Sequence, residues 1–493
     1  MLSSTPSGRQ STALALARGG VLGVATAVAL QFSSDPDLWG HLRYGLDWLS
    51  SFSVHTTDVY SFTSDRPWIN HEWLAEALFA ATYRVGGTIA LAILNAAIVL
   101  AALGVARWSA RRSGMAGWRL DVLTAAVFLF GVAPLTQTLR PQATSSLLFV
   151  ILLAVIRELD SGRYRMAFAL PLLFLAWANL HGAWVMAGGI LAIWTFVRIV
   201  QVPSHRVRLA LLGAGVASAA ATLVNPYGIE LWRFLIETVR FERSDIVEWG
   251  SLFSTPIMFV PWTATVAIAV LAFARSRREH WAYFAVCLFL AVASFRVIRL
   301  VPFFSLAVLL LPGPLLAGST APVRASIDAR GLIGASVIWM ICVASTTVGP
   351  LRVGCLQRRG SFSIDERAAA FLRENKATGK LVVWFDWGEY VSWHFGPNLK
   401  VSMDGRRETV YSEPFLQAHN AFYRNAPGAQ EFLERLSPDY VWLPRSLPVS
   451  ARIADWGWMP IFETDRSTVW ARGHLRGVWL PPPPVTSSCF PAA

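Results

Sequence analysis

A series of apolar runs separated by short basic loops most constrains how this chain can fold. Runs of about 20 apolar residues can cross the hydrocarbon core of a bilayer as helices. Only 15% of the residues are charged, whereas a soluble chain carries about a quarter. The sequence therefore predicts an α-helical multi-span membrane protein with about 11 transmembrane helices, a count left open by one or two because several runs are short. The candidate spans are residues 13–32, 88–106, 120–136, 142–156, 166–179, 183–200, 209–224, 257–274, 281–294, 301–317 and 331–349.

The distribution of basic residues indicates how these spans are oriented. With a cytoplasmic N-terminus, the five inner loops read "RWSARRSGMAGWR", "RELDSGRYR", "RIVQVPSHRVR", "ARSRRE" and "APVRASIDAR", and all five are basic. The positive-inside rule and anionic lipid then account for the net charge of +12, and the sequence contains no nucleic-acid-binding module. We therefore expect a multi-pass protein of the inner or plasma membrane, with a cytoplasmic N-terminus and an extracytoplasmic C-terminal domain.

The pattern becomes that of a soluble domain after the last apolar run. Helical periodicity in "SIDERAAAFLREN" and "AQEFLERL" alternates with the strand-like segments "LVVWF", "LKVSMDG", "YVWLP" and "STVWARG". Three parts are predicted: a transmembrane domain at 1–349 with an acidic first outer loop at 33–87, an extracytoplasmic α/β domain at 350–480, and a Pro-rich tail at 481–493.

The four cysteines fall into two groups. Cys287 and Cys342 lie in predicted spans, where apolar packing explains them. Cys355 and Cys489 lie in the predicted outer part, where an oxidising compartment would permit a disulfide bond, and the sequence leaves open whether they are bridged.

The first outer loop concentrates acidic residues in a chain that has 31 in all. It begins with "DPDLWGHLRYG", directly behind the first span, and a carboxylate there is costly without a partner or a task. The alternative is a hydrated loop whose tryptophans form an interfacial belt. Further on, "HEWLAEALFAATYRVGG" predicts an amphipathic helix on the outer surface that ends at Gly86 and Gly87. The acidic positions are Asp35, Asp37, Asp47, Asp58, Asp65, Glu72 and Glu76, and His41 lies close to the first two in the sequence.

This arrangement resembles the GT-C superfamily of integral-membrane glycosyltransferases. Short segments at loop edges, "LRPQ", "WANLHGAW", "VNPYG" and "FRVIRLVPFF", resemble bacterial members whose subfamily is unassigned, as do "WFDWGEYVSWHF" and "VSMDGR" near the C-terminus. The resemblance implies transfer of a sugar, hexosyl or pentosyl, from a polyprenyl-phosphate-linked donor to a glycan, lipid or protein acceptor on the outer face.

The acidic residues suit such a transfer, which needs a base for the acceptor hydroxyl. The superfamily places its acid just after the first span, which implies Asp37 or Asp35 as the base, and we prefer Asp37 because it leads directly into "LWGHL". The other carboxylate would orient it or bind a metal. The need for a metal stays open; oxygen ligands from Asp35 and Asp37 would suit Mg²⁺ or Mn²⁺. His41, His71 and Glu72 are candidate substrate-binding residues.

Arginines at outer turns are exceptions to the positive-inside pattern. Arg140, Arg296 and Arg299 lie at predicted outer span ends, where a guanidinium can grip the donor phosphate or simply reach lipid headgroups. His181 in "NLHG" lies at the same level and would either bind substrate or stabilise its turn. In the C-terminal domain, Asp386, Glu389 and residues 404–408 could face the acceptor, although "MDGR" also fits a plain turn.

Two other classes of function fit a polytopic chain. A transporter or flippase would show related halves with broken helices at the midplane, whereas here the polar residues gather at one face. A non-catalytic subunit of polysaccharide assembly could keep the same fold. Replacing Asp37 separates these classes, because only an enzyme would lose turnover while staying folded.

Overall fold

The computed structural model forms two compact units, and each is described by itself. The model describes residues 8–31, 34–54, 56–238, 241, 243, 246–317, 329–345, 364–473, 479–484 and 490. The helical unit comprises residues 1–32, 86–229 and 243–354, and the α/β unit comprises residues 33–85, 230–242 and 355–493. This division differs from the one expected at residue 349, because the first outer loop packs with the C-terminal region.

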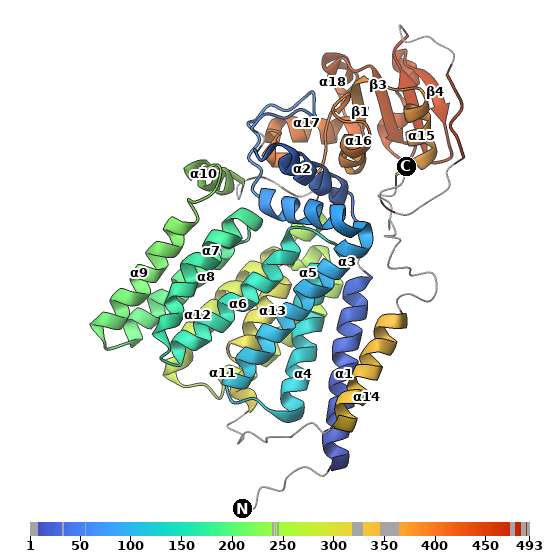
Figure 1. Ribbon diagram of the computed structural model, residues 1–493. Coiled ribbons are helices and arrows are strands. Elements are labelled where there is room, and N and C mark those ends of the chain that lie inside the picture. The colour runs from blue at the N-terminus through green and yellow to red at the C-terminus, as the bar shows by residue number, and fades with distance from the viewer. Residues whose placement is uncertain are drawn as a thin grey trace, which may run out of the picture. The chain divides into compact units, whose positions relative to one another are not determined.

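The helical unit places a helical segment on each of the eleven apolar runs (Figure 1). The π-helical turn Phe128–Val132 joins α4 to α5, and the 3₁₀ turn Tyr164–Phe168 precedes α7. The helices are α1 (Gly8–Leu30), the second part of α3 (Trp73–Arg112), α4 (Gly117–Val127), α5 (Ala133–Thr136), α6 (Gln142–Asp160), α7 (Ala169–Leu180), α8 (Trp184–Gln201), α9 (His205–Ala221), α11 (Phe259–Phe273), α12 (Trp281–Arg296), α13 (Val301–Leu310) and α14 (Ala329–Ser345).

Within the described residues, five helical segments are long and apolar enough to cross a membrane. Other apolar helices are shorter, Ala15–Leu30 and Arg330–Ser345 among them, so length and composition support several spans without confirming eleven. The five are Trp73–Arg112, Gly117–Thr136, Gln142–Asp160, Trp184–Gln201 and Pro256–Phe273.

Small residues let α1 and α14 pack closely, and the two helices lie side by side in Figure 1. A Cβ at Gly19 would collide with the backbone of Ala335, and one at Gly23 would stand 2.9 Å from Sγ of Cys342. Close approach of backbones at small residues is the usual way in which membrane helices associate. Cys342 and the buried Cys287 are free thiols, as expected, whereas Cys355 and Cys489 lie outside the described residues.

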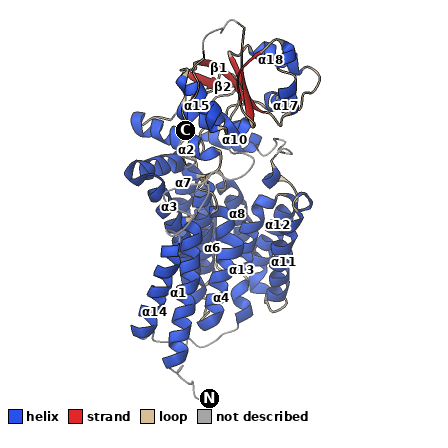
Figure 2. Cartoon of the chain, turned by 90° about the vertical axis from the view of Figure 1, so that its right-hand side faces the viewer, coloured by secondary structure: helices blue, strands red, loops and turns tan. Residues whose placement is uncertain are grey.

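The α/β unit contains a five-stranded mixed sheet with the order β2-β1-β3-β5-β4, drawn in red in Figure 2. Its strands are β1 (Gly379–Val383), β2 (Leu399–Val401), β3 (Tyr440–Pro444), β4 (Met459–Glu463) and β5 (Ser467–Ala471). The first three run parallel, and β5 is antiparallel to both β3 and β4. This region contains four helices, of which the sequence pattern predicted the first and the last and missed the two between them. These are α15 (Glu366–Glu374), α16 (Gly388–His394), α17 (Glu413–Tyr423) and α18 (Ala429–Leu436).

The first outer loop contributes helices and a sheet edge to this unit. Helix α2 (Asp37–Ser51) begins within the "DPDLW" stretch, and Trp73 begins α3. Ser61 bridges to Val401 beside β2, where the Phe62 N–H donates to the Val401 carbonyl at 3.1 Å. The α3 helix is interrupted by non-helical angles at Gly86 and Gly87, the pair at which the amphipathic helix was expected to end. The φ of +57° at Gly87 favours glycine there. Helix α10 (Ile229–Thr238) belongs almost wholly to this unit.

Candidate active site

Asp35 and Asp37 have different surroundings at the start of α2. The Asp35 Oδ1 atom accepts a hydrogen bond from the Asp37 backbone N–H at 3.2 Å. Asp37 is the first residue of the helix, after Pro36, where the positive end of the helix dipole stabilises a carboxylate. Asp35 therefore shapes the turn, and the Asp37 side chain occupies the first turn of the helix.

A second carboxylate, Glu389 on α16, meets Asp37 in the α/β unit. The position that a Cβ of Gly405 would take is 2.7 Å from Oδ1 of Asp37 and 2.8 Å from Oε1 of Glu389. A Cβ at Gly40 on α2 would collide with the Glu389 carboxylate. Glycine inside a helix costs about 0.5–1 kcal/mol relative to alanine, so the absence of a side chain at Gly40 is what admits Glu389.

Glu389 is 3% exposed, and its Oε2 atom has no hydrogen-bond partner among the described residues. Burial raises the pKa of Glu389 well above its usual value, the Asp37 and Asp404 carboxylates raise it further, and Arg406 only partly opposes them. These effects favour the protonated form of Glu389, which would spare the site a second negative charge next to Asp37.

A buried ion-pair network ties this site to the loop at residue 58. Arg406 donates to Asp58 at 2.8 Å and to Asp404 at 2.6 Å, and the side chains of both carboxylates are fully buried. Its guanidinium also lies over the rings of Trp68, at 4.7 Å, and Tyr44, at 5.1 Å. The "MDGR" segment thus does more than form a turn, because it supplies the cation between two buried carboxylates.

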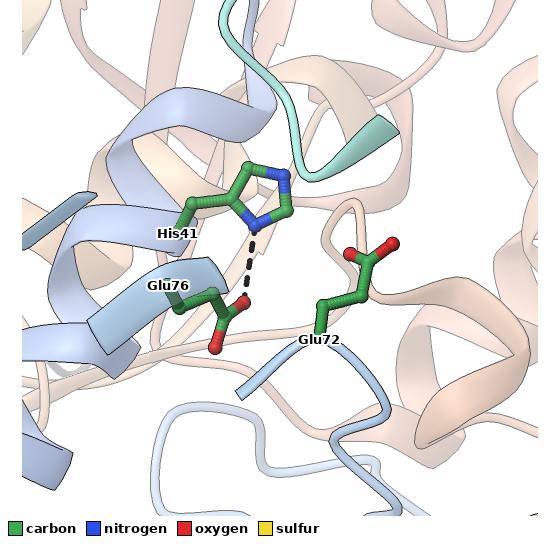
Figure 3. Close-up of side chains that lie close together, drawn as sticks. All are labelled: His41, Glu72 and Glu76. Atoms are coloured by element: carbon green, nitrogen blue, oxygen red, sulfur yellow. Dashed lines mark hydrogen bonds and ion pairs between the residues drawn. The ribbon is translucent and has the colours of Figure 1, made fainter. Parts of the chain in front are cut away.

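Next to these groups, His41, Glu72 and Glu76 form a cluster shown in Figure 3. The His41 Nδ1 atom lies 3.0 Å from Oε1 of Glu76, and both side chains are buried. Burial lowers the pKa of His41, but the hydrogen bond to Glu76 and the charges of Glu76, Glu72 and Asp37 outweigh it and raise the pKa to about 9. His41 and Glu76 therefore form an ion pair at neutral pH.

Among the described residues this is the one group of three histidine, cysteine or acidic side chains whose ligand atoms all lie within 4.8 Å of one another. A histidine with two carboxylates suits a divalent cation such as Zn²⁺ or Mn²⁺. Both carboxylate oxygens of Glu76 already have partners: Oε1 lies 3.0 Å from His41 Nδ1, and Oε2 accepts from the Asn70 side chain at 2.5 Å. A cation that binds here would therefore displace the proton of His41 and break these two hydrogen bonds. Asp35 and Asp37, the ligands considered from the sequence, lie outside this group.

His71 lies at the edge of the same cluster. Its Nε2 atom is 3.5 Å from Oε1 of Glu72, and its ring lies against Phe234 of α10. Its Nδ1 atom is buried and has no hydrogen-bond partner among the described residues. Four expected residues, Asp37, His41, His71 and Glu72, are therefore in one region of the α/β unit.

In the helical unit, two of the expected arginines share one carboxylate. Glu248 Oε1 accepts from Arg299 at 3.1 Å and from Arg140 at 3.4 Å. Arg299 also donates to the Gln142 side chain at 2.5 Å, and its guanidinium lies 5.6 Å from the Trp249 ring. We call these residues, Arg140, Gln142, Glu248, Trp249 and Arg299, the arginine cluster.

Arg296 and His181 lie elsewhere in the same unit. Arg296 is exposed at the end of α12, and no polar contact of its side chain is found among the described residues. His181 ends α7, and its Nδ1 atom lies 2.8 Å from Ser145 Oγ and accepts from the Ala183 N–H at 3.3 Å. The His181 contacts are those of a residue that stabilises its turn, which was one of the two interpretations from the sequence.

Sequence reasoning noted Glu389 and the 404–408 segment only as residues that could face an acceptor. Their association with Asp37 was missed, as was the pairing of Arg406 with Asp58. The only local signals were the conspicuous "WFDWGEY" and "VSMDGR" segments, and neither says which part of the chain it meets.

No family model and no curated protein sequence matches the chain. Solved structures do match it. The oligosaccharyltransferase of Archaeoglobus fulgidus is 12% identical with a TM-score of 0.54, over 86% of this chain and 69% of that one. ArnT from Cupriavidus metallidurans, bound to undecaprenyl phosphate, is 13% identical with a TM-score of 0.51, over 94% and 97%.

The mycobacterial arabinofuranosyltransferase AftD is 16% identical with a TM-score of 0.51, over 96% of this chain and 42% of AftD. At such identities the likeness concerns the fold. All three are GT-C glycosyltransferases, and the likeness extends over nearly the whole chain. The chain therefore shares its fold with these three membrane glycosyltransferases.

Proposed function

We propose that the protein is a membrane glycosyltransferase that moves a sugar from a polyprenyl-phosphate-linked donor to an acceptor on the outer face. The fold supports this class, as do the lipids named with its neighbours, undecaprenyl phosphate with ArnT and a dolichol-phosphate with the archaeal enzyme. The observation that carries the proposal is the meeting of Asp37 with the buried carboxyl of Glu389 over Gly405. Two carboxyl groups in different protonation states at one point are typical of acid–base sites.

In the proposed reaction, Asp37 is the general base. It accepts the proton of the acceptor hydroxyl while that oxygen bonds to the anomeric carbon of the sugar. The bond from this carbon to the donor phosphate breaks, and the phosphate leaves with the electron pair. Asp35 holds the turn through the Asp37 N–H. Burial and the neighbouring carboxylates raise the pKa of Glu389, and a protonated Glu389 would add no like charge next to Asp37.

In the helical unit, Arg299 and Arg140 are our candidates to bind the phosphate of a lipid-linked donor. Both guanidinium groups are held toward the same carboxylate, Glu248. Arginine binds phosphate through paired N–H groups, so a phosphate would take the place of the Glu248 carboxylate. Arg296, without such contacts, is better explained as a residue that reaches lipid headgroups.

A divalent cation would be held by His41, Glu72 and Glu76 rather than by Asp35 and Asp37. One structure of the archaeal neighbour contains zinc and sulfate, which supports testing zinc first. A bound cation would supply positive charge next to the reacting groups. This chain's own contribution is to hold the three ligand atoms within 4.8 Å of one another.

The expected orientation follows from the basic inner loops, with a cytoplasmic N-terminus and the C-terminal region outside the cell membrane. A single cysteine introduced at Glu408, in a variant that lacks the native cysteines, tests it. A membrane-impermeant maleimide should label this residue in intact cells, and protection of the cysteine would reverse the assignment.

Transfer is tested with the purified protein in nanodiscs, a panel of polyprenyl-phosphate sugars and cell-envelope glycan acceptors. Asp37→Asn keeps the shape of the side chain and removes the base, so it should lower turnover by about 10²- to 10⁴-fold. Binding of undecaprenyl phosphate should persist. The matched variant Asp35→Asn should lose less, because it disturbs only the turn.

If Asp35→Asn abolishes turnover and Asp37→Asn does not, the base is Asp35. If both variants turn over normally, the enzyme interpretation of this site is wrong. A flippase would instead move the lipid carrier across a bilayer without any change in the donor.

A further inference from the structure

A shallow pocket of about 490 Å³ in the α/β unit is separate from the carboxylate site. It lies where the first outer loop joins the edge of the sheet, next to β2 and β1. The loop is fixed there by backbone hydrogen bonds between Val401 and residues Tyr60 and Phe62, and by the Thr63 hydroxyl, which donates to the Ser402 carbonyl at 2.7 Å. Its lining includes Ser61, Phe62, Ser64, Lys380, Asn398 and Lys400.

This pocket holds two of the three lysines in a chain with 43 basic residues. Lys380 on β1 is directly opposite Lys400 on β2 in the parallel register, and both line the pocket. Like charges directly opposite each other on a sheet are unfavourable, by a few tenths of a kcal/mol up to about 1 kcal/mol. Every other basic residue in the chain except Lys376 is arginine.

No carboxylate of the described residues forms an ion pair with either ammonium group. The nearby Asp439 accepts a hydrogen bond from the Lys380 backbone N–H at 2.8 Å. Lys380 places its ammonium 5.6 Å from the centre of the Phe62 ring. Two adjacent ammonium groups without an ion-pair partner among the described residues, at a site with a cavity, have the electrostatic character of an anion-binding site.

The remaining lining groups are those that bind a sugar. Asn398 offers an amide that both donates and accepts hydrogen bonds, and Ser61 and Ser64 offer hydroxyls. Phe62 adds apolar surface of the kind that packs against the C–H face of a pyranose ring. A bare phosphate would need none of these groups.

We propose that this pocket binds an acidic saccharide, a sugar whose carboxylate or phosphate lies between Lys380 and Lys400 while its hydroxyls contact Asn398 and the serines. The site requires no bond to be made or broken. It does not depend on Asp37 or on the transfer reaction, so the two proposals can fail independently.

The scarcity of lysine allows a direct test on the full-length protein in nanodiscs of neutral lipid. The protein is treated with an amine-acetylating reagent, with and without trigalacturonate, and the acetylation of each lysine is measured by mass spectrometry. Lys380 and Lys400 should be protected by trigalacturonate, and the exposed Lys376 should react equally in both samples. The methyl ester of the same trisaccharide, which is neutral, should protect neither.

Calorimetric titration with trigalacturonate and with a phosphorylated oligosaccharide gives the second readout. The Lys380→Gln/Lys400→Gln variant should bind at least about tenfold more weakly, whereas Lys376→Gln, which removes the same charge outside the pocket, should bind as the native protein does. Unchanged affinity in the double variant would overturn the proposal.

The nature of the ligand is tested in parallel. Protection by inorganic phosphate alone at the concentration at which the saccharide protects would show that the sugar ring is not recognised, and would overturn the assignment to a saccharide. Protection on transfer into nanodiscs of anionic lipid, without any sugar, would assign the lysines to lipid headgroups instead. Asp37→Asn should leave saccharide binding unchanged.

Discussion

The α/β unit and the helical unit handle buried charge in opposite ways. In the α/β unit, carboxylates outnumber cations around Asp37; the pKa of Glu389 is raised, which favours its neutral form, and Asp58 and Asp404 share the cation Arg406. In the arginine cluster, two guanidinium groups share the single carboxylate of Glu248. The first arrangement suits a group that accepts a proton, and the second suits groups that bind an anion, in line with the roles proposed for Asp37 and for the two arginines.

The largest effect is expected from replacing Arg406, which tests how much its ion-pair network stabilises the α/β unit. Arg406→Met would leave Asp404 and Asp58 buried without a cation, and breaking such a network costs about 3–5 kcal/mol. We expect a large fall in the melting temperature of the protein in detergent. Arg406→Lys keeps the charge and loses the paired N–H geometry, so it should cost less. A loss below about 1 kcal/mol for Arg406→Met would show that the network contributes little.

The second test uses pH and the His41–Glu76 pair. The pKa of His41 rises from its usual 6.5 to about 9 in the folded protein because Glu76 outweighs the effect of burial. A raised pKa gives stability that is fully present below pH 6.5 and is lost as pH rises through 9. Chelator-treated protein should therefore lose up to about 3 kcal/mol across this window.

The control for this pH dependence is Glu76→Gln. This variant should be less stable than the native protein at pH 6, and its free energy of unfolding should change little between pH 6.5 and 9. Urea titrations at each pH measure both variants. If the free energy of unfolding changed with pH equally in the native protein and in Glu76→Gln, Glu76 would not be the group that raises the pKa of His41. Added Zn²⁺ should release a proton from His41 if the cluster binds the metal.

A third test asks whether the arginine cluster binds phosphate. Arg299→Ala removes a charge-assisted contact and should weaken binding of a polyprenyl phosphate by about 1.5–3 kcal/mol. Arg296→Ala, three residues away and without a polar contact among the described residues, is the matched control and should change affinity by less than about 0.5 kcal/mol. Equal losses of affinity in Arg299→Ala and Arg296→Ala would mean that both arginines contact lipid headgroups and do not bind the donor phosphate.

The smallest effect on stability and turnover is expected for the substitution Glu389→Gln. Glu389→Gln imitates the protonated carboxyl, so stability should change by less than about 1 kcal/mol, and turnover should persist. Glu389→Lys would place a buried cation against Gly40 and should destabilise the protein strongly. A large loss of turnover in Glu389→Gln, with folding intact, would mean that Glu389 gives up its proton during the reaction.

The elements of this protein followed from local patterns. Apolar runs predicted eleven helical segments, the Gly86–Gly87 pair marked the interruption of α3, and alternation predicted four of the five strands near the C-terminus, all except β4. The position of Asp37 behind the first span also suggested the acidic site. Each of these signals lies within about 20 consecutive residues, which is the range over which helical or strand periodicity can be read.

Only the tertiary structure decided which of these groups meet. Glu389 reaches Asp37 because Gly40 and Gly405 lack side chains, and Arg406 pairs with Asp58 from the far end of the chain. Lys380 and Lys400 become neighbours through the register of two parallel strands. No periodicity encodes such contacts, because they depend on the packing of segments that are distant in sequence. The sequence by itself determined the apolar helices, most of the strands and the acidic loop, while the raised pKa values of Glu389 and His41 arise only from burial and from the charges that folding brings together.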